Sequence, residues 1–485
     1  MSEQRFSGLF GASAPAEHYG ELTVDGADTV LRLIGKNLSS MRDANVLYGE
    51  TIRAHVSCID CIWTGTTFSL GEVTHAEQGT VFPHYVTQGQ RFFDPATDRV
   101  EALTFRFTDI DLLFGDSDSV GSFLASQELS EAVLTAARKG AVASPGAKPV
   151  ISYFDGHVEA WALDSEIGKI SIRNMVTVES ARPFTHNLEM SVRFSAPVDL
   201  KKSMDYLLLI RQGMSILAGR AQALEGIKLT VHDPETAAVG HRLLRLSWSL
   251  SPSGPPKSDA PPRPFAFPLD LRCRSEEFSA VLSKWFARAE AWNWPRARYV
   301  RSLEAGQHYS DDRLIAAANM FDLIPDSEYP APEPLAPEIL EAAAQVRALF
   351  KGLPDSIERN SVLGTIARFG KLSLPKKVIC RGDIVLSHLG SKLPGLQKVL
   401  KAAVLCRNHF VHGSDFDLHR LGAYMHLMTD ALEFVFVASE LIELGWDARS
   451  WASHGNSGGH RLTDFLATYA TTIDDFLSAY EGQKS

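Results

Sequence analysis

A change in the spacing of apolar residues divides this chain and most limits how it can fold. From about residue 20 to 250, apolar and polar residues alternate in runs such as Leu103–Phe107 and Ser191–Phe194, a pattern typical of half-buried strands. Beyond residue 270 the period becomes 3.6, as in 275–292, and this spacing indicates amphipathic helices. We therefore expect an α+β multidomain protein, with an antiparallel, sandwich-like β-rich domain followed by an all-α domain.

A proline-rich stretch marks the change. Ser251–Pro268 holds seven prolines together with glycine and serine, a composition that continues neither a ladder nor a helix and usually marks an exposed connection. The sequence thus predicts a β-rich domain at 1–255, a linker at 256–270 and an all-α domain at 271–485. Within the first domain, Asp25-Gly26 predicts a tight hairpin turn, and Lys201–Leu224 has helical spacing.

Composition narrows the class of protein. A chain of 485 residues with 45% hydrophobic and 22% charged residues is folded, and its length favours two to four domains at roughly 150 residues each. No signal peptide or transmembrane span is expected, because the start lacks a long apolar run and every apolar segment carries charges. Five cysteines fit reduced thiols, so we expect a cytoplasmic protein.

Positive charge gathers in one segment although the whole chain carries a net charge of -10. Residues 361–410 hold nine Lys and Arg against one acid, Asp383. Such a segment attracts phosphates without reading a sequence, although a solvated lysine face is an equally common reading. The lysines that we expect to contact nucleic acid are Lys376, Lys377, Lys398 and Lys401.

The basic segment ends in a helical pattern in which one position of the apolar stripe is occupied by a charged residue. Arg407 occupies a position of the 394–413 stripe that calls for an apolar residue, which flags a functional role. On an ideal helix Asn408 and His412 lie about 40° apart, whereas Arg407 lies about 140° from His412. A site that uses all three therefore needs a distorted helix end or a second chain. Gly413 can end the helix at His412, where the helix dipole favours an imidazolium.

A second apolar repeat follows this helix. Residues 421–442 place apolar side chains alternately four and three apart, the spacing of a packing seam. The seam could close within one chain or pair helices across a dimer, and the first arrangement is the commoner one.

The arrangement Arg407-Asn408-x-x-x-His412 resembles the motif of HEPN domains, which are all-α nucleotide-binding and RNase modules. The loose Arg-to-His spacing occurs five times in the chain, so the resemblance rests on Asn408, Gly413 and the flanking helices. It implies a HEPN domain with a core at about 337–446. It also implies that Arg407, Asn408 and His412 are catalytic, in a composite site that two protomers build.

The larger layout resembles the ApeA-type abortive-infection proteins of bacterial phage defence, through a β-rich region with Leu-Tyr-Gly-Glu-Thr-Ile-Arg-Ala at 47–54 joined to the HEPN-like part. This resemblance implies an endoribonuclease with RNA as its substrate and transfer RNA as a candidate target. The β-rich domain would act as a sensor or regulator that responds to a phage-encoded activator, and the chain would form a homo-oligomer without a membrane.

Chemistry gives the three motif residues separate roles. RNA supplies its own nucleophile, the 2′-OH, so no cofactor or metal is needed if one group moves the proton and another stabilises the phosphorane-like charge. We expect His412 to act as acid or base, Arg407 to contact phosphate oxygens, and Asn408 to orient the imidazole or a phosphate oxygen. The expected products are a 2′,3′-cyclic phosphate and a 5′-OH.

Other readings stay open. His55-x-x-Cys58-x-x-Cys61 has ligand-like spacing, but on a strand Cys58 and Cys61 point to opposite faces, so buried small hydrophobes are a better interpretation than zinc ligands. The main alternative function is a non-catalytic HEPN scaffold that binds RNA or a nucleotide. A third is a β-rich ligand-binding protein whose helical domain only dimerises.

Overall fold

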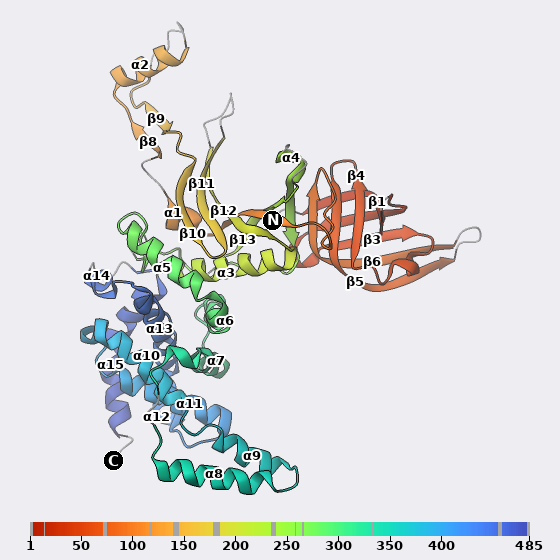
Figure 1. Ribbon diagram of the computed structural model, residues 1–485. Coiled ribbons are helices and arrows are strands. Elements are labelled where there is room, and N and C mark those ends of the chain that lie inside the picture. Colours follow the sequence, from red (N-terminus) through yellow and green to blue (C-terminus); the bar gives the residue numbers. More distant parts are fainter. Residues whose placement is uncertain are drawn as a thin grey trace. The chain divides into compact units, whose positions relative to one another are not determined.

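The computed structural model describes residues 3–13, 15–70, 75–115, 119–138, 145–177, 185–233, 239–257, 259–263, 266–331, 334–453 and 458–482. The chain forms two compact units, residues 1–287 and 288–485. The first unit holds all the described strands, and the described part of the second is all-helical. The predicted order, an antiparallel β-rich region followed by an all-helical one, is confirmed (Figure 1).

Twelve strands of the first unit form one sheet in the order β10-β11-β12-β7-β13-β14-β6-β3-β2-β1-β4-β5, and every pairing in it is antiparallel. The strands are β1 (Gln4–Gly11), β2 (His18–Val24), β3 (Val30–Gly35), β4 (Val46–Thr51), β5 (His55–Leu70), β6 (His75–Gly89), β7 (Val100–Phe107), β10 (Glu159–Ser165), β11 (Gly168–Thr177), β12 (Thr185–Val198), β13 (Leu224–Val231) and β14 (Leu243–Trp248). A separate hairpin pairs β8 (Val120–Leu124) with β9 (Val150–Phe154).

Six of these strands close into a ring, because β5 also pairs with β6. The long strand β6 joins this ring to the rest of the sheet. Its residues 77–81 pair with β3, whereas its residues 85–88 pair with β14. One strand therefore belongs to both parts of the sheet, and the ring has no free edge along β6.

The ring encloses an apolar core that includes Phe10, Leu31 and Cys58. Cys61 also packs against this core, so the expectation that Cys58 and Cys61 point to opposite faces is wrong. The reason is local: Asp60, between them, has a φ of 54°, which breaks the strict alternation of a strand. The predicted hairpin turn at Asp25-Gly26 also differs, since a short 3-10 helix at Gly26–Asp28 joins β2 to β3.

Helix α3 (Leu200–Ala218) begins one residue before the predicted helical segment at 201–224 and ends six residues before its end. Asp199 begins it, because its carboxylate accepts from the backbone N–H of Lys202 at 2.7 Å, and a left-handed Gly219 ends it. The smaller helices of this unit are α1 (Ile110–Phe114), α2 (Gln127–Arg138) and α4 (Val239–Arg242).

The proline-rich stretch is a strap on the first unit, not the exposed connection that its composition predicts. Arg211 donates to the carbonyl of Ser253 at 2.9 Å, and Arg220 donates to that of Asp259 at 2.9 Å. Phe267 is buried. The next helix, α5 (Ser275–Ala287), belongs to the same unit, because Phe278 packs edge-to-face on Trp161. The boundary between the units therefore lies after 287, whereas the sequence places this helix with the helical domain.

The second unit is a bundle around one nearly buried helix. Its helices are α6 (Ala289–Glu304), α7 (Asp311–Leu323), α8 (Pro337–Lys351), α9 (Ile357–Ile366), α10 (Leu374–Leu389), α11 (Leu396–His412), α12 (Leu418–Leu421), α13 (Met425–Leu444), α14 (Ala448–Ser453) and α15 (Arg461–Glu481). The central helix is α13, which packs against α7, α10, α11 and α15. The seam predicted at 421–442 therefore closes within the chain.

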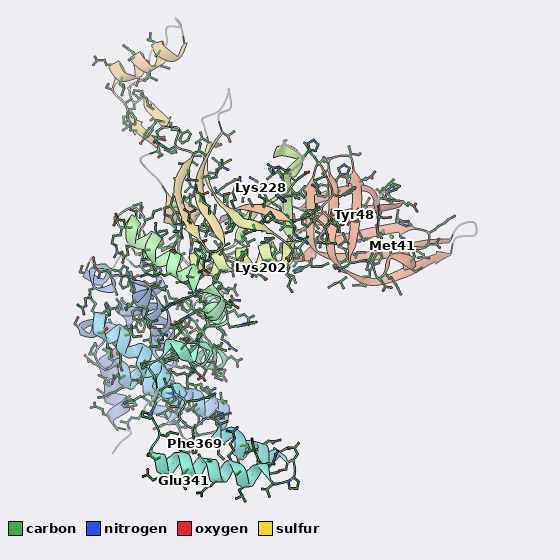
Figure 2. The ribbon with its side chains drawn as sticks, viewed as in Figure 1. Met41, Tyr48, Lys202, Lys228, Glu341 and Phe369 are labelled. Atoms are coloured by element: carbon green, nitrogen blue, oxygen red, sulfur yellow. The ribbon has the colours of Figure 1, made fainter. Side chains whose placement is uncertain are left out.

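The exception to this packing is the hairpin of α8 and α9. Neither helix buries a single residue, although the two pack on each other. Ile357 is 84% exposed and Leu349 is 65% exposed. Figure 2 shows the side chains of this hairpin, with Glu341 of α8 and Phe369, just beyond α9, labelled.

Candidate active site

Helix α11 carries the three predicted site residues at its carboxyl end. Glycines in the left-handed region bound it, with a φ of 71° at Gly395 and 67° at Gly413. The N–H of Gly413 donates to the carbonyl of His409 at 2.8 Å, which confirms that Gly413 ends the helix. The buried stripe of α11, which includes Leu400 and Ala403, packs on neighbouring helices. Because that packing fixes the helix, it also fixes where its last turn presents polar side chains.

The guanidinium of Arg407 holds the site together. One terminal nitrogen, Nη1, lies 3.1 Å from Oδ1 of Asn408 and 3.2 Å from Nε2 of His412. The other, Nη2, donates to Oδ1 of Asn319 on α7 at 3.0 Å. The Nε of Arg407 is buried and has no hydrogen-bond partner among the described residues. The long side chain thus spans the last turn of α11 and reaches a second helix.

A single chain therefore brings Arg407, Asn408 and His412 together, contrary to the expectation from an ideal helical wheel. The helix runs regularly to His412, so no distortion is needed. The wheel gives the direction of each Cβ, whereas a guanidinium stands several bonds away and can fold back along the helix. The site does not need a second chain for these contacts.

The contact with Arg407 sets the role that Nε2 of His412 can play. A guanidinium has only donors, so a hydrogen bond between Nη1 and the imidazole uses Nε2 as the acceptor, in the tautomer that carries its proton on Nδ1. The ring is exposed, whereas Arg407 and Asn408 are half-buried. A solvent-accessible neutral imidazole beside a fixed cation can accept a proton from a substrate whose charge the cation stabilises.

Two residues of this region are not predicted from the sequence. Asn319 is polar within the apolar run Ala-Ala-Asn-Met-Phe of α7, and this local conflict is the only signal that could have found it. The second is His409, whose Nδ1 lies 2.7 Å from the carbonyl oxygen of Ser414. Because a carbonyl only accepts, Nδ1 is the donor there, and this bond ties the segment after α11 to the helix end.

The four predicted RNA-binding lysines occupy different environments. Lys376 and Lys401 are exposed and line one shallow hollow of about 720 Å³ between α10 and α11. Lys398 lies 2.6 Å from Oε1 of Glu481 in a partly exposed ion pair. Lys377 is buried, and its ammonium lies 2.9 Å from Oδ1 of Asp326 and over the ring of Tyr329. The structure thus corrects the prediction for Lys377, whose ammonium is already engaged.

The cysteine pair of the first unit has the surroundings of packing residues. Cys58 is fully buried, and the thiol of Cys61 lies 3.3 Å from the carbonyl oxygen of Cys58. Burial raises the pKa of the Cys58 thiol well above its ordinary value and that of Cys61 to about 12, which opposes the thiolate form that zinc binds. Over the described ranges, no three His, Cys, Asp or Glu side chains gather as a metal site would require.

Comparisons with known proteins bear on the first unit. Residues 6–285 match the family model of ApeA N-terminal domain 1. The matched segment includes the proline-rich strap and most of α5, in agreement with the boundary after residue 287. No curated protein and no solved structure matches the chain. In the part of the chain that the structure describes, no helix has both the length and the apolar character needed to cross a membrane. Since the match covers more than half of the 485 residues, the chain belongs to the ApeA family, by its N-terminal domain 1.

Proposed function

We propose that this protein is an endoribonuclease of bacterial anti-phage defence, which acts by abortive infection and cleaves RNA at the carboxyl end of α11. The second unit would be its HEPN domain. The observation that carries the proposal is the contact of one guanidinium, that of Arg407, with both Asn408 and His412. The match to ApeA N-terminal domain 1 supports the link to phage defence.

The geometry suggests how a phosphodiester would react. A phosphate oxygen can take the place of Nε2 as the acceptor for Nη1 of Arg407, which frees the lone pair of Nε2 to remove the proton of the 2′-OH. The 2′-oxygen then attacks the phosphorus, and the guanidinium stabilises the added negative charge. The imidazolium formed on His412 gives this proton back through a water molecule to the leaving 5′-oxygen, so the products are a 2′,3′-cyclic phosphate and a 5′-OH and His412 is neutral again. RNA provides the nucleophile, and the proposed reaction uses no metal.

Asn408 and Asn319 would have different tasks. Asn408 touches the reacting region through its half-buried amide and can orient a phosphate oxygen or the guanidinium. Asn319 is a positioning residue. It accepts a hydrogen bond from Arg407 and would affect the reaction through that guanidinium. Holding the guanidinium from two helices reduces the freedom that it would otherwise lose on binding a phosphate.

An RNA strand would follow the exposed face of α11. Lys401 and His412 are eleven residues apart, which places them within about 20° on the helix and about 16 Å apart along its axis. Lys376 lines the same hollow as Lys401, so both ammonium groups can contact phosphates away from the reacting bond. Lys398 could join them only by leaving Glu481. Transfer RNA remains the candidate target.

A second copy of the chain would complete the proposal. The motif helix exposes apolar side chains beside the site, with Leu405 45% exposed and Val411 41% exposed. Exposed apolar groups on a charged helix favour contact with another protein surface. The homo-oligomer would therefore form through the helical unit, and the β-rich unit would respond to a phage-encoded activator protein.

The proposal is tested by incubating purified wild type, His412→Ala and His419→Ala with total cellular RNA in EDTA, with and without an extract of phage-infected cells. His419 is the matched control, an exposed histidine that follows the same helix and lies outside the Arg407 cluster. We expect cleavage by wild type and His419→Ala and at least about a 100-fold loss in His412→Ala. Binding of RNA without any cleavage would instead support a non-catalytic HEPN scaffold.

A further inference from the structure

A cavity of about 410 Å³ opens in the second unit away from the Arg407 cluster. Tyr309, Asp430 and Phe465 line it, with contributions from α6, α13 and α15. None of Asn319, Arg407, Asn408 and His412 is among its lining residues. A cavity of this size holds a small organic molecule, so its chemistry can be considered independently of RNA cleavage.

The two arginines near the cavity already donate hydrogen bonds to other groups of the protein. Arg313 donates from Nε and Nη2 to the two carboxylate oxygens of Glu433, both at 2.8 Å. Arg461 donates to Glu433 at 3.3 Å and to the carbonyl of Gly306 at 3.2 Å. Glu433 therefore has two cations that donate hydrogen bonds to it, whereas Asp430, one turn earlier on α13, has only the more distant Nη2 of Arg313 at 3.9 Å.

One carboxylate oxygen of Asp430 lacks a hydrogen-bond donor among the residues that the structure describes. Its Oδ2 accepts from the hydroxyl of Tyr309 at 2.7 Å, whereas its buried Oδ1 has no hydrogen-bond partner and lies 3.9 Å from Nη2 of Arg313. Burial, reinforced by repulsion from Glu433, raises the pKa of Asp430 to about 7, although Tyr309 and Arg313 oppose the shift. A carboxyl group so placed gains from any cation that reaches it.

The rest of the lining is aromatic. Phe434 and Phe465 stack with ring centroids 4.4 Å apart, and both line the cavity together with Tyr309. Aromatic faces attract an ammonium group and also bury an apolar body. We propose that this cavity binds a small organic cation, a protonated amine on an apolar or aromatic body, with the ammonium at Asp430 and the body against Phe434 and Phe465.

Binding of such a cation should depend on pH. The groups that face Asp430 are Tyr309, just before α7, Arg313 on α7 and Glu433 on its own helix. The other titratable or charged side chains of the lining are His426, Arg461 and Asp464. The ligand favours the ionised carboxylate, so the affinity rises with pH until Asp430 has lost its proton and is constant above that point.

The test uses the full chain and a matched pair of probes, 2-phenylethylamine and the neutral 2-phenylethanol, in calorimetric titrations at pH 8 and pH 5.5. Asp430→Asn removes the charge and keeps an acceptor for Tyr309, and Thr468→Trp fills the exposed rim of the cavity. Asp474→Asn, an exposed acid on the same helix as Thr468, is the control.

We expect the amine to bind at least tenfold more tightly than the alcohol at pH 8, and more weakly at pH 5.5. Asp430→Asn and Thr468→Trp should each lose at least tenfold in affinity for the amine, whereas Asp474→Asn should match wild type. Thermal unfolding confirms that each variant is folded. Equal binding of the alcohol and the amine, no binding of the amine at pH 8, or unchanged binding by folded Asp430→Asn would each overturn the proposal. Because RNA cleavage is not the readout, the proposal stands or falls separately from the nuclease.

Discussion

At the scale of single residues, the reach of a side chain decides what the candidate site can do. The sequence predicts that Arg407, Asn408 and His412 act together, but the helical wheel sets Arg407 apart from His412 because it ignores side-chain length. The structure adds Asn319, which only a fold that places α7 beside α11 can bring to Arg407. Contacts between helices far apart in sequence leave almost no mark in the local pattern.

The role of Asn319 can be measured. Asn319→Leu removes the acceptor for Nη2 of Arg407, so the guanidinium should lose its fixed orientation and kcat for RNA cleavage should fall by about 10- to 100-fold with little change in KM. Asn319→Asp keeps an acceptor and should recover part of the loss. Equal kcat values for Asn319→Leu and wild type would show that α7 does not position Arg407.

Asp430 makes the stability of the second unit depend on pH. The folded protein keeps this proton up to about pH 7, whereas the unfolded chain releases it near the ordinary pKa of 3.8. The folded state therefore loses stability relative to the unfolded state as the pH rises from about 4 to 7. Asp430→Asn should avoid this loss and be more stable than wild type at pH 8, by on the order of 2–4 kcal/mol.

Denaturant titrations of both proteins at pH 4.5 and pH 8 check this prediction. The stability advantage of Asp430→Asn should shrink at the lower pH, where the carboxyl group of the wild type is protonated in the folded state. An advantage of the same size at both pH values would contradict the assignment of the proton to Asp430.

At the scale of elements, the apolar period locates helices and strands but does not say how strands close. The 3.6 period predicts α11 and its end at Gly413, because a left-handed glycine is a local signal. The ring of β1 to β6 depends instead on pairings between strands that do not follow one another in the sequence, β1 with β4 and β3 with β6. The proline-rich strap also differs from what its composition predicts. Arg211 and Arg220, which lie outside it in the sequence, donate hydrogen bonds to its carbonyl groups.

The hairpin of α8 and α9 should be the least protected helical element of the second unit. Its helices bury no residue, whereas α13 is buried along nearly its whole length, and protection against amide exchange follows tertiary burial. Hydrogen–deuterium exchange followed by mass spectrometry should show α8 and α9 exchanging well before α13. Protection of the hairpin equal to that of α13 would mean that another surface covers it in solution.

At the scale of the whole molecule, the strap and α5 belong to the first unit, so a fragment that ends at residue 287 should fold and one that ends at 255 should not. Cutting at 255 removes Asp259 from Arg220 and Phe278 from Phe114 and Trp161. It leaves a buried arginine short of an acceptor and exposes aromatic rings. The comparison is the yield of soluble protein and the cooperativity of thermal unfolding for the two fragments.

Two equally stable fragments would contradict this boundary and restore the one that the sequence predicts at 256–270. The change in the spacing of apolar residues shows that strands give way to helices near this point. It cannot show which unit the connecting residues pack against. That choice depends on residues such as Trp161 and Arg220, which lie long before the strap in the sequence.

The central claim, that Arg407 and His412 cleave RNA through its own 2′-OH, is tested most directly by the ends of the fragments. Wild type and Arg407→Ala are incubated with RNA in EDTA, and the ends are identified by their reactivity toward phosphatase and kinase. We predict 2′,3′-cyclic phosphates and 5′-OH ends from wild type, and no cleavage by a folded Arg407→Ala. Fragments with 3′-OH and 5′-phosphate ends, or equal cleavage by Arg407→Ala, would contradict the account.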